Sequence, residues 1–289
     1  MARHVVTHNG PFHADDVLAW ALLSAFVDPD FVPIRTRDEA VIAKGHIVFD
    51  VGGEYDPSRA RFDHHQLKYK GDFSSAGMVL DWLISEEKLD KGAGLFLKTR
   101  LVDYVDAVDN GRQMPDSSVP CFASIVEAFG SGCDSMDDFD QAFLRAGDFA
   151  RIYVQGLVNG FWEVEACRKR VEDEMSRAQQ SGSRIMVFDS YCKWKKPYFE
   201  NQGKSHPTDY VLFPSNDGSW RLVAIPPKLD DFGQKRPLPA EWAGLMGEEL
   251  SSVMGIKDAV FCHRNRFIAV FKTRAAVDLA IETFSLDRH

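Results

Sequence analysis

HVVTHNGPFHADDVLAWALLSAF, residues 4–26, sets the pattern of the N-terminal half of the chain. Its first five residues predict a short buried strand, and residues 15–26 predict a helix with acidic residues in its first turn. NGPFH between them is expected to be a strand-to-helix loop. Residues 31–36 and 46–53 are two more strand candidates, and 38–45 could form a short helix between them. Strands and helices that alternate at this spacing predict a parallel sheet.

The rest of the chain predicts a second, smaller domain. Helical patterns continue over 76–87, 94–108 and 136–180, and SGSR at 181–184 is a plausible linker. Five strand candidates and two helices follow, over 184–190, 209–215, 220–226, 259–263 and 266–272, and near 241–254 and 274–284. We therefore expect an α/β protein: residues 1–180 with a mostly parallel sheet flanked by helices, and residues 181–289 as a smaller α+β domain.

Composition narrows the class of protein. The net charge of −9 argues against a generally basic, nucleic-acid-coating surface and leaves only local basic patches for phosphates. The five cysteines are widely spaced and contain no CxxC pair, which is typical of reduced thiols in a cytosolic protein. MARHVVTHNG lacks the apolar core of a signal peptide, and no run of eighteen apolar residues occurs. We expect a cytoplasmic protein without a membrane partner.

Metal-ligating residue types gather where the predicted strands end. They are His8, His13, Asp15, Asp16, Asp50, Asp63, His64, His65, Asp106 and Asp109. Because the carboxyl ends of parallel strands form the ligand crevice of an open α/β sheet, these separate segments are expected to meet in one site. Simpler roles remain open for some of them. Asp15 and Asp16 would also favour a helix N-terminus, and Asp109 could cap the turn that Asn110 and Gly111 predict.

Carboxylates mixed with imidazoles favour Mn²⁺, with Mg²⁺, Co²⁺, iron or zinc as possible substitutes. The ligands outnumber the needs of one ion, so we expect two divalent ions at a separation of about 3.5–4 Å. Such a pair both activates water and neutralises a phosphoryl oxygen. The expected chemistry is hydrolysis of a phosphate ester.

Three segments resemble the metal motifs of a known family: THNGPFHADD at 7–16, FDVGGEYDPSRARFDHHQ at 49–66 and VDAVDNG at 105–111. Four segments of the C-terminal half, such as KWKKPYFE and RPLPAEWAGL, resemble successive blocks of the same family. On these motifs the chain resembles the DHH phosphoesterase superfamily and, within it, the MYG1 (UPF0160) proteins, over nearly its whole length.

This resemblance implies a DHH-type N-terminal domain that holds the metals, with substrate between it and the C-terminal domain. It also implies an Mn²⁺-dependent phosphodiesterase, since the eukaryotic relatives are regarded as 3′-to-5′ RNA exonucleases. The implied metal ligands are His8 or His13, Asp15, Asp50, Asp63, His64 and one of Asp106 and Asp109. The resemblance makes His65 a ligand or a group beside the scissile phosphate, and gives Asp63 a catalytic role as well.

The chain departs from the superfamily pattern twice. The usual His-x-x-x-Asp-x-Asp motif is replaced by His8-Asn-Gly-Pro-Phe-His13-Ala-Asp15-Asp16, and Ile268-Ala269-Val270-Phe271 stands where related domains carry a Gly-Gly turn. Phosphate contacts in the C-terminal domain are instead expected from His263, Arg264, Arg266 and Lys272. The segment 193–196, KWKK, could stack bases of a single strand, or Trp194 could pack in a core.

Three functions follow as hypotheses. The first is a two-metal exonuclease acting on single-stranded RNA or short oligonucleotides, in a chain that could form homo-oligomers. The second is hydrolysis of a small phosphorylated compound such as pyrophosphate or a nucleotide. The third is an inert protein that senses a metal or a nucleotide, which the departure at Ile268-Ala269-Val270-Phe271 keeps open.

Overall fold

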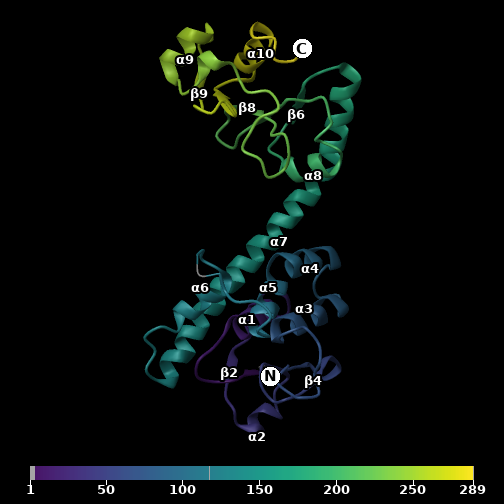
Figure 1. Cartoon of the computed structure of the whole chain (residues 1–289), viewed down its shortest axis with the longest axis vertical. Helices are drawn as coiled ribbons and strands as arrows, with labels where there is room; N and C mark the ends of the chain where they lie inside the picture. Colours follow the sequence, from purple (N-terminus) through teal and green to yellow (C-terminus); the bar gives the residue numbers. More distant parts are fainter. Residues whose placement is uncertain (1–3, 117, 289) are drawn as a thin grey trace. The chain divides into compact units, whose positions relative to one another are not determined.

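The computed structural model describes residues 4–116 and 118–288, and the chain divides into two compact units, residues 1–161 and 162–289 (Figure 1). Residues 1–3, which open the segment in which no signal peptide was expected, lie outside the described residues. The boundary between the units falls within helix α7 (Met136–Ser181). The domain division expected at residue 180 stays a prediction.

A five-stranded, mostly parallel sheet forms the framework of unit 1, as predicted. Its strand order is β2-β1-β3-β5-β4. The strands are β1 (Val5–Thr7), β2 (Pro33–Arg35), β3 (Ile47–Phe49), β4 (Tyr55–Asp56) and β5 (Arg61–Phe62). β1 pairs in parallel with β2 and β3, and β3 pairs in parallel with β5; only β4 runs antiparallel, against β5. The carboxyl ends of β1, β3 and β5 therefore share one edge of the sheet.

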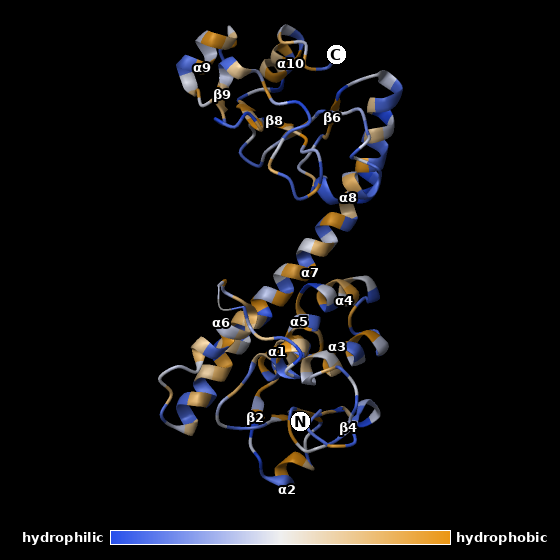
Figure 2. Ribbon diagram, in the orientation of Figure 1, coloured by the Kyte–Doolittle hydropathy of each residue, from blue (hydrophilic) through white to orange (hydrophobic). Residues whose placement is uncertain are grey.

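Helices complete unit 1. They are α1 (Ala14–Phe26), α2 (Glu39–Ile42), α3 (Ser75–Ser85), α4 (Lys91–Leu97), α5 (Asp103–Asp109), α6 (Phe122–Phe129) and the first part of α7, with a 3₁₀ turn at Pro57–Arg59 and a π-helical turn at Lys98–Val102. Residues 14–24 of α1 are all buried, so α1 is a core helix, and Leu18 and Leu22 share a core with Phe49 and Phe62 of the sheet. Figure 2 shows hydrophobic and hydrophilic residues alternating along α7, as an amphipathic helix requires.

Unit 2 is built on a mixed sheet of order β6-β7-β8-β10-β9, in which β6 and β7 are parallel and the other pairs antiparallel. Its elements are β6 (Ile185–Val187), α8 (Lys195–Glu200), β7 (Tyr210–Pro214), β8 (Trp220–Ala224), a 3₁₀ turn at Ala240–Trp242, α9 (Gly247–Met254), β9 (Ala259–Cys262), β10 (Ile268–Phe271) and α10 (Arg274–Thr283). All five predicted strands are present.

One sequence prediction about a helix needs correction, and two helices were missed. The helix predicted near 241–254 begins only at Gly247, because Gly244 has a φ of 79° and Met246 is extended, with φ of −148° and ψ of 158°. The helices α6 and α8 were not predicted. Of the two roles considered for Trp194, core packing is the one observed, since its side chain is buried among Tyr198 and Phe213.

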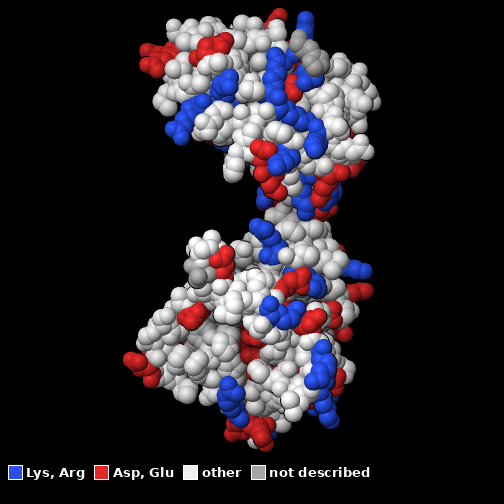
Figure 3. Space-filling view, viewed as in Figure 1, with Lys and Arg blue, Asp and Glu red and all other residues white. Residues whose placement is uncertain are grey.

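No helix in the described part of the chain is long and apolar enough to span a membrane. On the face seen in Figure 3, Lys and Arg lie beside Asp and Glu over much of unit 1, while a run of Lys and Arg crosses unit 2.

Candidate metal centre

The strand ends of unit 1 carry the residues that the sequence singled out. His8 directly follows β1, Asp50 directly follows β3, and His64 and His65 lie just beyond β5. Asp50 has a φ of 54°, a left-handed conformation that few residues other than glycine adopt. Strain of this kind is found where a side chain must be aimed at a site.

Three groups of potential ligands lie around this edge of the sheet. In each group the ligand atoms lie within 4.8 Å of one another. The groups are His8, Asp16 and Asp50; Asp50, His64 and His65; and His13, Asp15 and Asp109. We call these eight residues the ligand cluster. Asp50 joins the first two groups, and His64 lies 3.1 Å from Asp109 and thus reaches the third.

Asp15 provides the strongest sign that this site suits a cation. Its side chain is 1% exposed, and neither carboxylate oxygen has a hydrogen-bond partner. Burial and the neighbouring charges of Asp50 and Asp109 raise the pKa of Asp15 well above its ordinary value. A buried carboxylate without donors is costly unless a cation compensates for it. The residues present therefore fit a divalent metal.

His8 bridges two carboxylates. Its Nε2 lies 3.1 Å from Asp16 Oδ2 and 3.2 Å from Asp50 Oδ2. Burial opposes protonation of His8, but the hydrogen bonds to Asp16 and Asp50 outweigh burial and raise its pKa to about 10. Because a metal ligand must be deprotonated, binding of a cation at this nitrogen would release that proton.

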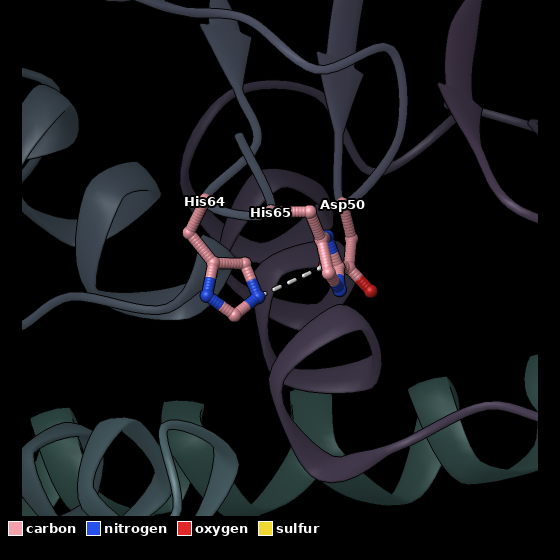
Figure 4. Close-up of side chains that lie close together, drawn as sticks. All are labelled: Asp50, His64 and His65. Atoms are coloured by element: carbon pink, nitrogen blue, oxygen red, sulfur yellow. Dashed lines mark ion pairs between the residues drawn. The ribbon is translucent and has the colours of Figure 1, made fainter. Parts of the chain in front are cut away.

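His64 is oriented by a residue that the sequence had suggested only as part of a turn. Its Nδ1 lies 3.3 Å from Asn110 Oδ1, while Nε2 lies 3.4 Å from Asp50 Oδ1 and faces Asp109. Asn110 in turn donates through Nδ2 to the backbone oxygens of Asp72 and Asp106. Figure 4 shows His64, His65 and Asp50 gathered at the strand ends. An amide that fixes one ring nitrogen leaves the other free for a metal.

His65 and Asp63 form a pair. His65 Nδ1 lies 2.7 Å from Asp63 Oδ1, which also accepts from the His65 backbone N–H, and Gly53 N donates to the other oxygen. The hydrogen bond to Asp63 raises the pKa of His65. The His65 side chain is 63% exposed, so its second ring nitrogen is accessible to a ligand.

Asp106 and Asp109 differ in their surroundings. Asp106 is buried, and its Oδ1 accepts hydrogen bonds from Ser74 N, Ser74 Oγ and Gly77 N at 2.9, 2.7 and 3.1 Å. It ties α5 to the start of α3 and is not in the ligand cluster, whereas Asp109 is. The sequence did not decide which of Asp106 and Asp109 is the metal ligand, and the geometry favours Asp109.

The remaining predicted residues are placed as follows. His13 caps α1 and belongs to the third group, so both candidate histidines of the first motif lie in the ligand cluster. Asp63 lies outside the three groups, and its role as a ligand stays a prediction. His263, Arg264 and Arg266 lie in the turn between β9 and β10 of unit 2, and Lys272 directly follows β10. Their contact with substrate also stays a prediction.

Three contributors were not among the ligands that the family resemblance implied. Asp16 contacts His8, Asn110 orients His64, and Ser75 Oγ donates to Asp50 Oδ1 at 3.1 Å. The adjacent Asp15-Asp16 pair was a signal for the first, although a helix N-terminus explained it equally well. Nothing in the local sequence marks Ser75, which arrives from a separate helix.

Comparison with known proteins places the chain among relatives of similar length. Residues 4–284 match a family model described as "Uncharacterised protein family (UPF0160)", MYG1_exonuc. The MYG1 protein of Chlamydia pneumoniae is 38% identical over 289 residues, covering 99% of this chain and 98% of that protein. The human protein named MYG1 exonuclease is 32% identical over 321 residues, covering 96% and 85%. A crystal structure of RecJ in complex with Mn²⁺ from Thermus thermophilus matches at 12% identity and a TM-score of 0.25, covering 98% of this chain and 52% of that one.

Proposed function

The chain belongs to the MYG1 (UPF0160) family, and on that premise we propose that it is a metal-dependent phosphodiesterase that removes nucleotides from the 3′ end of single-stranded RNA or short oligonucleotides. The observation that carries the proposal is the buried Asp15 carboxylate, which has no hydrogen-bond donor and faces other ligand-type groups. Relatives that cover nearly the whole chain and are named exonucleases support the choice of reaction.

We propose Mn²⁺ as the native metal, with Mg²⁺ and Co²⁺ as substitutes, and two ions per site. Asp50, which belongs to two of the three groups, would be shared by both ions. Asp15, Asp109 and His13, with His64, would hold one ion, and His8 and Asp16 the other. Such ions, when bound, neutralise charge on the phosphoryl oxygens and activate the attacking water.

The protein's own side chains then have separate tasks. Water adds to phosphorus, the P–O ester bond breaks, and the departing oxygen gains a proton. Asp63 accepts the Nδ1 hydrogen of His65 and, by raising the His65 pKa, favours the imidazolium form, whose second N–H can donate toward the charge that develops on the phosphate. Asn110 keeps His64 in the orientation that a ligand needs.

Two substrates separate this proposal from its closest alternative. Mn²⁺-loaded protein is incubated with 5′-labelled oligoribonucleotides and, in parallel, with pyrophosphate. We expect ladders that shorten one nucleotide at a time, without release of phosphate from pyrophosphate. Rapid hydrolysis of pyrophosphate with intact oligonucleotides would replace the exonuclease by a small-molecule phosphohydrolase. Tight metal binding without turnover of either substrate would instead favour an inert sensor.

Single-stranded RNA as partner, a cytoplasmic location and homo-oligomers remain predictions from the sequence.

A further inference from the structure

A cavity of about 620 Å³ opens beside the ligand cluster, entirely within unit 1. His13 and Asp109, two members of the cluster, form part of its wall. The cavity lies among α1, α5, α6 and α7, and contacts of α6 with α1 and α5 place these helices together (Figure 1). Its volume is within the range of pockets that hold small organic ligands. A group bound there would be adjacent to whatever the metals hold.

The wall of this cavity is mostly apolar, and carboxylates are its charged groups. Apolar side chains dominate it, including Phe12, Val108, Ala123 and Phe139. Among the described residues that line the cavity none is Lys or Arg, and Glu127 supplies a carboxylate in addition to Asp109. Because His13 and Asp109 face the metal centre, a second phosphate farther into the cavity would meet the carboxylate of Glu127 and no Lys or Arg of the described residues, which is unfavourable. A flat apolar ring with N–H or O–H donors would find aromatic surface and hydrogen-bond acceptors.

From this complementarity we propose that the cavity holds the nucleoside attached to the phosphate at the ligand cluster, and thereby selects nucleotide esters over pyrophosphate. The proposal rests on the proposed function and specifies its substrate. Phe12 and Phe139 provide apolar surface for the base, and Glu127 accepts a hydrogen bond from the base or the ribose.

The test uses a variant that fills the cavity and a control on the same helix. Ala123→Leu adds bulk to the cavity wall, whereas Ala128→Leu makes the same change at an exposed position of α6 outside the wall. Calorimetry on the Mn²⁺-loaded full-length chain measures binding of adenosine 5′-monophosphate and of inorganic phosphate. We expect Ala123→Leu to weaken binding of the nucleotide by at least about tenfold and to leave phosphate binding unchanged. Ala128→Leu should change neither.

A second cavity-filling variant guards against misfolding of the first. Gly130 lines the cavity with φ of −82°, which any residue adopts, and a Cβ there would lie 3.7 Å from Phe12 Cζ, an ordinary contact. Gly130→Leu should therefore fold and reproduce the loss of nucleotide binding. Equal affinity of the wild-type protein for nucleotide and phosphate, or unchanged nucleotide binding in both variants, would overturn the cavity assignment while leaving a phosphoesterase in place. A protein that binds neither compound and cleaves no phosphoester would overturn the proposed function and the cavity assignment together.

Discussion

Asp15→Asn should make the metal-free protein more stable and remove its response to Mn²⁺. The carboxylate of Asp15 is buried, its two oxygens accept no hydrogen bond, and Asp50 and Asp109 add repulsion. Asparagine has nearly the same shape but no charge, and the introduced amide can donate to neighbouring carboxylates. A buried carboxylate that serves to bind a cation is expected to destabilise the protein when the cation is removed.

The size of the effect follows from the burial of one unsatisfied group. A buried polar group without a partner costs about 1–3 kcal/mol. For a protein of this size each kcal/mol shifts Tm by roughly 2–4 °C, so Asp15→Asn should raise Tm in EDTA by roughly 2–12 °C. Saturating Mn²⁺ at a hundred times Kd should stabilise the wild-type protein by about 2.7 kcal/mol, and the variant by much less. Thermal unfolding followed by circular dichroism, with EDTA or Mn²⁺, measures both effects.

Asp106→Asn is the matched control. Asp106 is equally buried but accepts three hydrogen bonds from Ser74 and Gly77. Asp106→Asn should lower Tm both in EDTA and in Mn²⁺, because it weakens hydrogen bonds from Ser74 and Gly77 that form without a metal. The reasoning is refuted if Asp15→Asn lowers Tm in EDTA as Asp106→Asn does, or if it keeps the full stabilisation by Mn²⁺.

Three further predictions concern single side chains. His64→Ala should weaken Mn²⁺ affinity markedly by calorimetry, since its Nε2 faces Asp50 and Asp109; wild-type affinity would exclude it as a ligand. His65→Gln should lower kcat more than Mn²⁺ affinity, because its contact would be made mainly in the transition state, whereas equal losses would make it a ligand. Burial lowers the pKa of His206 below its ordinary value of 6.5, so the stability that neutral His206 contributes above pH 6.5 is lost as pH falls through the lower pKa of the folded state. His206→Gln should therefore flatten the fall of Tm between about pH 7 and pH 5. An unchanged dependence of Tm on pH would contradict this.

Much of unit 1 could be predicted because its signals are local. The run from residue 4 to residue 26 changes from a short apolar strand to a long buried helix, and the structure places β1 and α1 there. The strands β4 and β5 are two residues long each, too short for an alternating pattern to be recognised. They arise from pairing with neighbours and not from local preference.

The ligand cluster could be predicted in outline but not in detail. Asp106 and Asp109 are three residues apart on one helix, so they share a face and look equivalent in the sequence. What separates them is Ser74, about thirty residues away, which donates two hydrogen bonds to Asp106. Contacts of this kind depend on tertiary packing, and no local pattern encodes them.

An anomalous diffraction map from crystals soaked with Mn²⁺ tests the central claim most directly, that the strand ends of unit 1 form a divalent metal centre. We expect two peaks within coordination distance of the ligand cluster, with Asp50 touching both and Asp15, His64 and Asp109 around one of them. An Mn²⁺ peak at Asp106, or no peak among Asp15, Asp50 and His64, would contradict the account.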